Sequence, residues 1–297
     1  MTDQLVQFSD ALAARVEATK PTAIAIRLAH ERHITGIVWR PDIVVTSEQA
    51  LPRREEFEVV TAGGAVTTAK VAGRDSSTNI AVLRLQEPLA SYSITTSEAH
   101  AGAIVIAIAA DGTGGATARL GIVNSVGPEW HSTRGGLIDR RIALDVRLAR
   151  SEEGGPIFDA AGNYIGMSTF GPRGQVLVIP TTTIDRILPM LLKNGRVARG
   201  WLGVTLQAVA VPDALHEAAD QSSGLMVMSV LENSPAAQAG ILAGDIILSV
   251  DGNSTYRFRK IARYFGSESI GRKTDLRLIR SGAVITVNTT ITERPAA

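Results

Sequence analysis

Glu152 and Glu153 are adjacent carboxylates followed directly by Gly154-Gly155. Hydrolysis by two carboxylates requires both carboxyl groups to converge on one substrate atom. Neighbouring side chains normally diverge, so we do not expect these two carboxyl groups to converge. Arg147 and Arg150 lie close in sequence, and we expect Glu153 to form an ion pair with one of them. An exposed pair of this kind stabilises a protein by only ~0–1 kcal/mol. A catalytic Glu152/Glu153 pair is kept as an alternative.

Other common catalytic and metal-binding sets are missing or scattered in the sequence. The chain has no cysteine, and its five histidines are His30, His33, His100, His131 and His216. No cluster of His, Asp and Glu has the spacing of a metal site, and the glycine-rich segment 111–115 lacks the Lys-Ser/Thr of a phosphate loop. The sequence therefore predicts no metal and no cofactor.

The composition is that of a globular protein with about two domains. The length of 297 residues corresponds to two domains of ~150 residues each, and 45% of the residues are hydrophobic and 20% charged. Thirty Lys+Arg against 29 Asp+Glu leave a formal charge of +1. No global basic field is available, so neither nucleic acid nor an anionic membrane is an expected partner.

The sequence contains no membrane span and leaves the compartment open. The longest uncharged apolar stretch, 102–110, is far shorter than the ~18 residues of a transmembrane helix. Residues 1–21 lack a basic segment followed by an apolar core, so they do not form a signal peptide. The chain is cytosolic as written, or a signal was removed before its first residue.

Hydrophobic spacing predicts one helix followed by a mainly β region. Leu5, Phe8, Leu12 and Val16 form an amphipathic stripe within residues 1–21, and Pro21 ends that helix. Turn signals then separate about a dozen short strands without intervening helices, which favours barrels or sandwiches. The expected strands are 22–28, 36–39, 43–46, 58–60, 66–72, 80–85, 104–108, 120–126, 141–145, 156–158, 164–167 and 176–179.

The C-terminal part is predicted to be a small α+β module. A short helix, 183–194, and a polar linker, 195–199, precede it. Within the module, Ser234 is a plausible N-cap and Pro235 the first residue of a helix. A second helix is expected at about 256–265, followed by a hairpin that turns at Ser281-Gly282.

Two stretches resemble a known protein family. Residues 200–293 resemble a PDZ domain, through Arg199-Gly200-Trp201-Leu202-Gly203-Val204 and NSPAAQAGILAGDIILSVDG at 233–252. Residues 22–194 resemble the chymotrypsin-like protease domain of the HtrA/DegP family. The matching segments are IVVTSEQAL (43–51), AKVAGRDSSTNIAVLRL (69–85), LGIVNSVG (120–127) and SEEGGPIFDAAGNYIG (151–166). The resemblance implies a chymotrypsin-like double β-barrel followed by a PDZ domain.

The catalytic positions of the family are occupied by other residue types. The resemblance places the general-base His at Gln49, the orienting Asp at Asn79 and the nucleophilic Ser at Glu153. Ser151 and Glu152 stand where the family has Gly and Asn. A shift of the alignment by one residue would bring Glu48 to the base position, but no shift supplies a His, since His33 lies about 16 residues earlier.

These replacements predict a pseudoprotease. Acyl transfer needs a hydroxyl nucleophile, an imidazole that accepts its proton and a carboxylate that orients the imidazole, and losing one member costs about 10⁴–10⁶-fold. An amide at Gln49 accepts no proton near neutral pH, and Asn79 carries no charge. Ser151 disfavours the backbone bend that Gly allows, and Glu153 places negative charge near the expected oxyanion.

The resemblance also implies partners. Trp201, Leu202, Gly203 and Val204 occupy the carboxylate-binding loop of PDZ domains, where successive N–H groups bind the C-terminus of a peptide. A PDZ domain kept only for packing is the alternative. We expect a peptide- or unfolded-polypeptide-binding protein of protein quality control and a homo-oligomer (a trimer, by resemblance). If a signal was removed before the first residue, the resemblance implies the periplasm or cell envelope. Two other interpretations stay open: an unorthodox hydrolase, or a structural subunit that regulates active HtrA paralogues.

Overall fold

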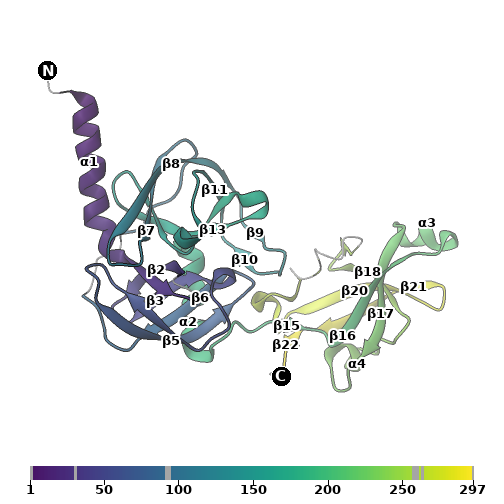
Figure 1. Cartoon of the computed structure of the whole chain (residues 1–297). Coiled ribbons are helices and arrows are strands. Elements are labelled where there is room, and N and C mark those ends of the chain that lie inside the picture. The colour runs from purple at the N-terminus through teal and green to yellow at the C-terminus, as the bar shows by residue number, and fades with distance from the viewer. Residues whose placement is uncertain (1–2, 30–31, 91–94, 256–260, 262–263, 296–297) are drawn as a thin grey trace. The chain divides into compact units, whose positions relative to one another are not determined.

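The computed structural model describes residues 3–29, 32–90, 95–255, 261 and 264–295. Two compact units divide the chain (Figure 1). The first comprises residues 1–130 and 137–197, and the second comprises residues 131–136 and 198–297.

The first unit contains two closed six-stranded β-barrels, as the sequence predicts. In the first barrel the strands pair in the order β1-β2-β3-β6-β5-β4, all antiparallel. Its strands are β1 (Ala23–Arg27), β2 (His33–Arg40), β3 (Ile43–Ser47), β4 (Glu56–Val60), β5 (Val66–Asp75) and β6 (Ile80–Leu85).

The second barrel follows along the chain, with the order β11-β14-β13-β12-β7-β8. Its strands are β7 (Ile104–Ala110), β8 (Ala116–Gly127), β11 (Arg141–Asp145), β12 (Pro156–Asp159), β13 (Tyr164–Phe170) and β14 (Val176–Pro180). The short strands β9 (Trp130–His131) and β10 (Leu137–Ile138) precede β11 and are not predicted by the sequence. Several strands are longer than predicted, most clearly β8.

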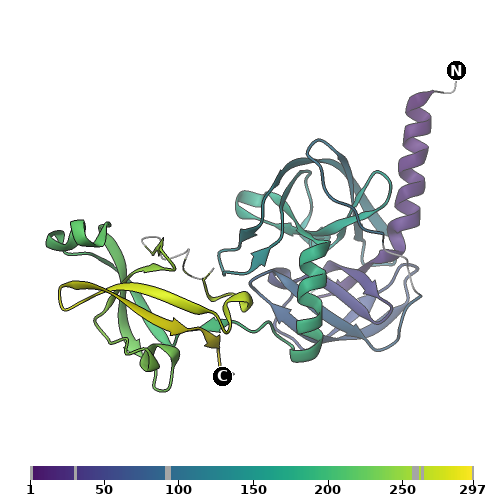
Figure 2. The same ribbon diagram turned by 180° about the vertical axis from the view of Figure 1, so that it is seen from behind.

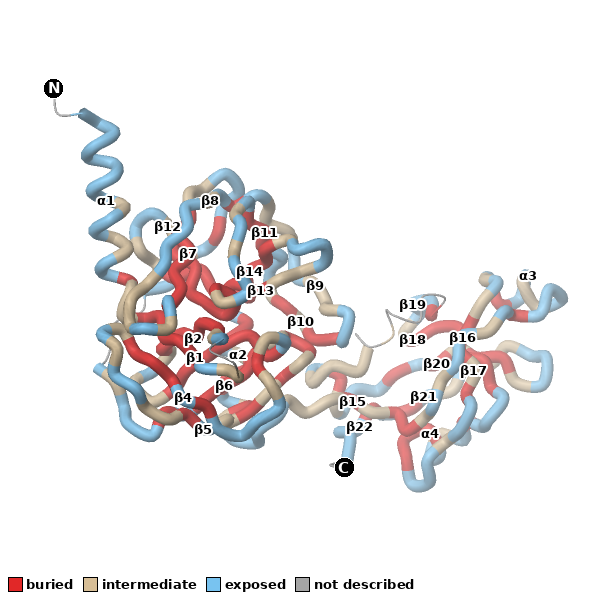
Figure 3. Tube along the Cα trace, viewed as in Figure 1, coloured by how far each residue is buried: buried red, intermediate tan, exposed pale blue. Residues whose placement is uncertain are grey.

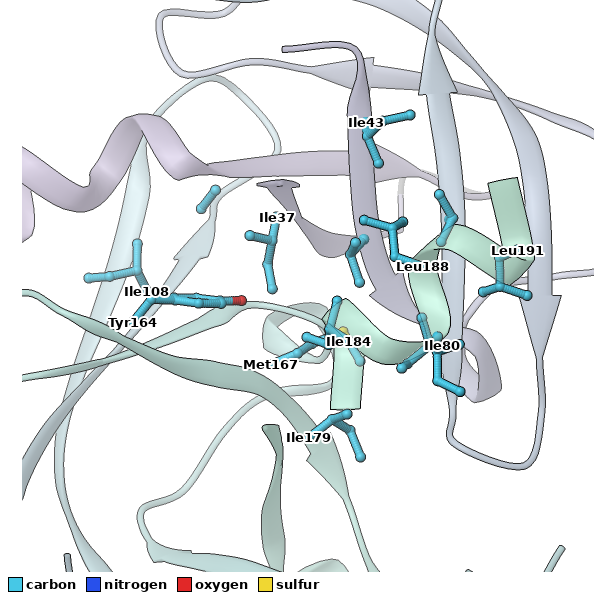
Figure 4. Packing of buried hydrophobic residues seen from close by; sticks show 14 of the residues in the cluster. Ile37, Ile43, Ile80, Ile108, Tyr164, Met167, Ile179, Ile184, Leu188 and Leu191 are labelled. Atoms are coloured by element: carbon cyan, nitrogen blue, oxygen red, sulfur yellow. The ribbon is translucent and has the colours of Figure 1, made fainter. Parts of the chain in front are cut away.

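A buried cluster joins strands of both barrels to helix α2 (Thr181–Asn194). Ile37 of β2 and Ile108 of β7 lie in this cluster with Met167 of β13 and Ile184 of α2, and all four side chains are buried (Figure 4). Gly195 ends α2 in the left-handed conformation, as expected. Figure 2 shows α2 along the strands of the first unit. The two barrels therefore share one core, which fixes the geometry between them.

Helix α1 (Gln4–Thr19) begins at Asp3, whose side chain accepts from the Leu5 N–H, and a 3₁₀ turn over Lys20–Thr22 follows it. Leu12 and Val16 pack against the shared core, whereas Leu5 is 73% and Phe8 45% exposed. The exposed N-terminal turns appear in pale blue in Figure 3. Only the C-terminal half of the predicted apolar stripe is covered within this chain.

The second unit contains an open sheet with the order β16-β17-β18-β20-β21. Ser234 caps helix α4 (Pro235–Gln238) by accepting from the Ala237 N–H, as expected. The predicted helix 256–265 lies largely outside the described residues. The strands are β15 (Gly200–Trp201), β16 (Val204–Ala210), β17 (Ser223–Val230), β18 (Ile246–Val250), β19 (Asn253–Ser254), β20 (Lys273–Arg280), β21 (Ala283–Thr290) and β22 (Thr292–Glu293), and the other helix is α3 (His216–Ala219).

Candidate functional site

Gln49 lies on a 3₁₀ turn, Glu48–Ala50, directly after β3. Glu48 is buried at the start of this turn and pairs with Arg53 over 3.4 Å. Arg74 approaches the same carboxylate, and burial lowers the pKa of Arg74 while Glu48 opposes that shift. With Glu48 held inward, the next side chain, Gln49, is presented at the surface of the first barrel.

Asn79 ends the tight loop between β5 and β6. The Asp75 carboxylate shapes this loop by accepting from the backbone N–H and the hydroxyl of both Ser77 and Thr78. Asn79 itself has φ +61°, a left-handed conformation that asparagine tolerates better than most residues. Its side-chain oxygen accepts from the Gln49 N–H over 2.7 Å, so the two loops are joined.

Glu153 follows a 3₁₀ turn, Arg150–Glu152, in the second barrel. The next residue, Gly154, has φ +86°, and a Cβ there would come within 2.3 Å of the Thr35 carbonyl oxygen. Only glycine allows this approach to β2. The Thr35 N–H donates to the Glu153 carbonyl, so the loop is fastened to the first barrel and the Glu153 side chain faces the loops of Gln49 and Asn79.

These three predicted residues meet in one hydrogen-bonded cluster with Ser47 and Thr169. Oε1 of the buried Glu153 accepts from Nε2 of Gln49 at 2.6 Å, Oγ of Ser47 at 2.8 Å and Oγ1 of Thr169 at 3.2 Å. Nδ2 of Asn79 donates to the hydroxyls of Ser47 and Thr169. The cluster therefore consists of one carboxylate surrounded by neutral donors, and in the described part of the chain no cation pairs with it.

Ser47 and Thr169 were missed by the sequence analysis. Ser47 lies within the matched segment 43–51, two residues before Gln49, and that position was its only signal. Thr169 lies near the end of β13, outside every matched segment. Its place in the cluster follows from the closure of the second barrel, which a local pattern does not encode.

The expected ion pair of Glu153 with Arg147 or Arg150 is wrong for the described residues. It is Glu152 that pairs with an arginine, namely Arg119 of β8, with 3.0 Å between Nε and Oε1. Glu152 also accepts from the Ala149 N–H at the start of its own 3₁₀ turn. The two adjacent carboxylates thus bind separate sets of partners, because the turn directs them to different strands.

The backbone N–H groups at the end of the 150–153 loop point into the protein. Ser151 lies inside the 3₁₀ turn, and the Glu153 N–H donates to the Arg150 carbonyl at 3.4 Å. The Gly154 N–H in turn donates to the Ser168 carbonyl at 3.0 Å. The N–H groups of residues 153 and 154 are therefore directed at protein acceptors.

A cleft of about 1070 Å³ opens beside the cluster. Gln49, Glu153 and Ser151 contribute to its wall. His33 also lines it, and the Nε2 atom of this ring lies 3.1 Å from the Ala110 carbonyl oxygen. Among the hydrogen bonds of the described residues, none joins a histidine to the cluster.

The predicted loop of the second unit borders a smaller pocket, of about 240 Å³. Gly203 has φ +84°, and a Cβ there would lie 2.1 Å from Cβ of Ser234. Leu202 is buried in the core of the unit, so the loop is anchored by its side chain. Within the described residues the N–H groups of Leu202 and Gly203 donate to no protein acceptor. The pocket is lined by Gly200, Trp201, Leu202, Gly203, Val204, Leu206, Ile261 and Phe265.

Within the described residues, no group of three or more His, Asp or Glu residues is placed to hold a metal ion. Among the helices in the described ranges, none is long and apolar enough to cross a membrane.

Family models match both units. The model of the trypsin-like peptidase domain matches residues 34–167, which include Gln49, Asn79 and Glu153. The model of the PDZ domain matches residues 200–291.

Curated relatives are similar along most of this chain. A "Probable periplasmic serine endoprotease DegP-like" of Brucella suis biovar 1 (strain 1330) is 31% identical over 295 residues, covering 95% of this chain and 56% of the relative. The "Periplasmic serine endoprotease DegP" of Salmonella typhimurium (strain LT2) is 30% identical over 254 residues, covering 82% of this chain and 53% of the relative. The chain spans about half the length of these curated relatives.

Solved structures share the fold over nearly the whole chain. The serine endoprotease from Yersinia pestis superposes with a TM-score of 0.68 at 25% identity, covering 97% of this chain and 98% of that one. The HtrA-type protease AlgW with decapeptide gives a TM-score of 0.68 at 23% identity, covering 96% and 99%. A trypsin-like peptidase domain is followed by a PDZ domain in this chain, and the relatives are similar to it along most of its length. The chain therefore belongs to the HtrA-type protease family.

Proposed function

We propose that this chain is a pseudoprotease of the family, which binds peptides or unfolded polypeptide through its PDZ domain without cleaving them. The observation that carries the proposal is the Gln49–Glu153 hydrogen bond of 2.6 Å within the cluster that also contains Asn79. In the alignment suggested by the matched segments, these are the positions of the base, the nucleophile and the orienting acid.

The chemistry of the cluster supports an inactive site. A serine protease needs a base that withdraws the proton from its nucleophile. The Gln49 amide donates to Glu153 and cannot serve as that base near neutral pH. Oε1 of Glu153 accepts three hydrogen bonds, which hold this carboxylate in the cluster. A carboxylate is a weak nucleophile, and the cluster offers no proton shuttle to assist it.

The backbone of the loop supports the same proposal. Acyl transfer draws on N–H groups aimed at the developing oxyanion, and removing one such donor costs about 10²–10³-fold in rate. Here the Glu153 N–H donates inside its own turn to Arg150. The Glu153 carboxylate would in addition repel an oxyanion that formed beside it.

Peptide binding is supported by the loop 201–204. The N–H groups of Leu202 and Gly203 donate to no acceptor among the described residues, so they provide the donors that a C-terminal carboxylate requires. The neighbouring pocket has an apolar wall for the last side chain. The HtrA-type protease AlgW, which shares this fold, has been solved with a decapeptide and with a tripeptide.

The alternative of a Glu152/Glu153 hydrolase is less well supported. Two catalytic carboxyls must reach one substrate atom, but Glu152 is buried and held by Arg119 and Thr117. If this alternative were right, Glu153→Gln would abolish the turnover of a peptide library while the protein stays folded.

Fluorophosphonate labelling and casein cleavage test the proposal directly. We expect no labelling and no cleavage by the purified protein, with an active HtrA-type protease as the positive control. Glu153→Ala serves as the matched variant. Cleavage that survives repurification and is the same in Glu153→Ala would come from a site other than the cluster and would overturn the proposal.

A further inference from the structure

The cleft beside the cluster has an unusual distribution of charge. Arg32, Arg147 and Arg150 line it, and all three are exposed. Glu153 is the sole carboxylate among the described lining residues, and it is buried, with its Oε1 atom accepting from neutral donors. The chain as a whole carries a formal charge of only +1, so this cationic rim is a local feature.

The arginines of the rim are not neutralised within the described chain. No described carboxylate lies within ion-pairing distance of Arg147 or Arg150, although both are close in sequence to Glu152 and Glu153. The Arg32 side chain makes one hydrogen bond within the described chain, from Nε to the Ala29 carbonyl at 3.5 Å. Guanidinium groups recognise carboxylates through paired N–H donors, so these side chains are available for an acidic ligand.

The apolar wall of the cleft indicates that its ligand is a peptide. Leu28, Ile34, Val146, Leu148 and Phe170 contribute apolar surface to the same cleft. This mixture of cationic and apolar groups fits a chain in which acidic and apolar side chains alternate. A nucleic acid offers phosphates at regular spacing and requires a longer basic track or stacking platforms.

The backbone of residues 146–148 is a second reason to expect a peptide in this cleft. Strand pairing of β11 with β8 ends at Asp145, and no backbone hydrogen bond is found for residues 146–148 within the described chain. The backbone groups of such a segment are available to pair with the main chain of an added peptide. Arg147 lies within this segment and Arg150 directly after it.

We propose that this cleft binds acidic, extended peptide segments, with Arg147 and Arg150 as the groups that select for negative charge and Arg32 as a third cation. This site is separate from the PDZ loop and takes internal segments rather than C-termini. It rests on the proposed function only in that the bound peptide leaves the cleft uncut.

Fluorescence anisotropy on the full chain tests the proposal. The probe is a short fluorescein-labelled, C-terminally amidated peptide in which Glu alternates with Ala or Val, and its partner probe has Gln in place of Glu. Amidation removes the carboxylate that the PDZ loop would bind. We expect the Glu probe to bind more tightly than the Gln probe, and the difference to shrink when the ionic strength is raised from about 0.05 to about 0.3 M.

The double variant Arg147→Gln/Arg150→Gln should weaken binding of the Glu probe roughly tenfold, the sum of two exposed pairs. Arg54→Gln/Arg140→Gln is the matched control, because it removes the same charge at exposed arginines outside the cleft and should leave the affinity unchanged. Equal loss in both double variants, or equal affinity for the two probes, would overturn the proposal.

Two further readouts separate the possible sources of failure. Mass spectrometry of the probe after incubation reports cleavage, which would contradict the proposed pseudoprotease but leave the charge preference to be judged by affinity. A single-stranded oligonucleotide of the same charge serves as competitor. If it bound more tightly than the Glu probe and depended on Arg147 and Arg150, the site would be one for nucleic acid and the peptide proposal would be wrong.

Discussion

The side-chain amide of Gln49 donates to the carboxylate of Glu153 over 2.6 Å, and these two residues belong to different barrels. Gln49 follows β3 of the first barrel, whereas Glu153 precedes β12 of the second. The hydrogen bond therefore contributes to holding the barrels together at the cleft, and the cluster has a structural role whether or not it has a catalytic one.

Removing the carboxylate should destabilise the first unit. In Glu153→Ala the hydroxyls of Ser47 and Thr169 and the Gln49 amide lose their common acceptor, and unsatisfied buried donors cost about 1–3 kcal/mol. We expect the midpoint of urea denaturation to fall. Glu129→Ala removes an exposed carboxylate of the same type and is the control. Identical midpoints for the two variants would show that the cluster contributes no stability.

Restoring the three triad residue types alone should not restore proteolysis. In Gln49→His/Asn79→Asp/Glu153→Ser the 3₁₀ turn still directs the N–H of residue 153 at Arg150, so the oxyanion donor is missing. Adding Ser151→Gly and Glu152→Asn relaxes that turn and frees it from Arg119. We therefore expect casein cleavage by the five-residue variant to exceed that by the three-residue variant by about 10²-fold or more.

The three-residue variant needs a folding control, since it alters the buried cluster. Circular dichroism and labelling of the new serine by a fluorophosphonate would show whether the fold and the nucleophile are intact. Robust casein cleavage by the folded three-residue variant would mean that the loop does not block the oxyanion site.

The PDZ loop should distinguish a free C-terminus from an amidated one. We expect the N–H groups of Leu202 and Gly203, which donate to no acceptor among the described residues, to bind a carboxylate through charge-assisted hydrogen bonds, which are about twice as strong as neutral ones. We expect the free-acid form of a C-terminal peptide to bind at least roughly tenfold more tightly than its amide in calorimetry, a difference of ~1.4 kcal/mol.

Gly203→Ala provides the matching variant for this loop. The new Cβ would collide with Ser234, and φ +84° is strained for alanine, so binding should be lost together with some stability of the second unit. Equal affinity of the wild-type protein for acid and amide would contradict carboxylate binding.

Asp111 should make stability depend on pH. Hydrogen bonds from the Thr113 and Gly115 backbone lower the pKa of this exposed carboxylate below its unfolded value. Its contribution is therefore present above the unfolded pKa and is lost as the pH falls through the folded pKa. Asp111→Asn should lower the melting temperature at neutral pH, and this difference should disappear as the pH falls through the folded pKa. A loss of the same size at neutral and at acidic pH would contradict this linkage.

The sequence was sufficient for the architecture but not for the contacts of the site. The strands of both barrels and the Ser234 cap follow from short-range patterns of hydrophobic and turn residues. Strand β8 is longer than predicted because its exposed Ala116–Arg119 segment carries little apolar signal but pairs with β7.

The contacts around Glu153 depend on long-range packing. Resemblance to the family placed Gln49, Asn79 and Glu153 together, and the structure brings them within hydrogen-bond distance. The sequence analysis did not find Thr169, and it assigned the arginine pair to Glu153 instead of Glu152. Thr169 was missed because closure of the second barrel brings it to the site. The pairing error arises because the 3₁₀ turn, and not the spacing along the chain, decides which carboxylate faces β8.

Closure of both barrels has a consequence for self-association. In the described residues of these two sheets every strand is paired on both sides, so neither barrel offers a free edge to another molecule. The sheet of the second unit is open, with β16 and β21 at its ends. Aggregation by β-pairing at high concentration should therefore begin in the second unit, and charged substitutions along β16 or β21 are the changes that would suppress it.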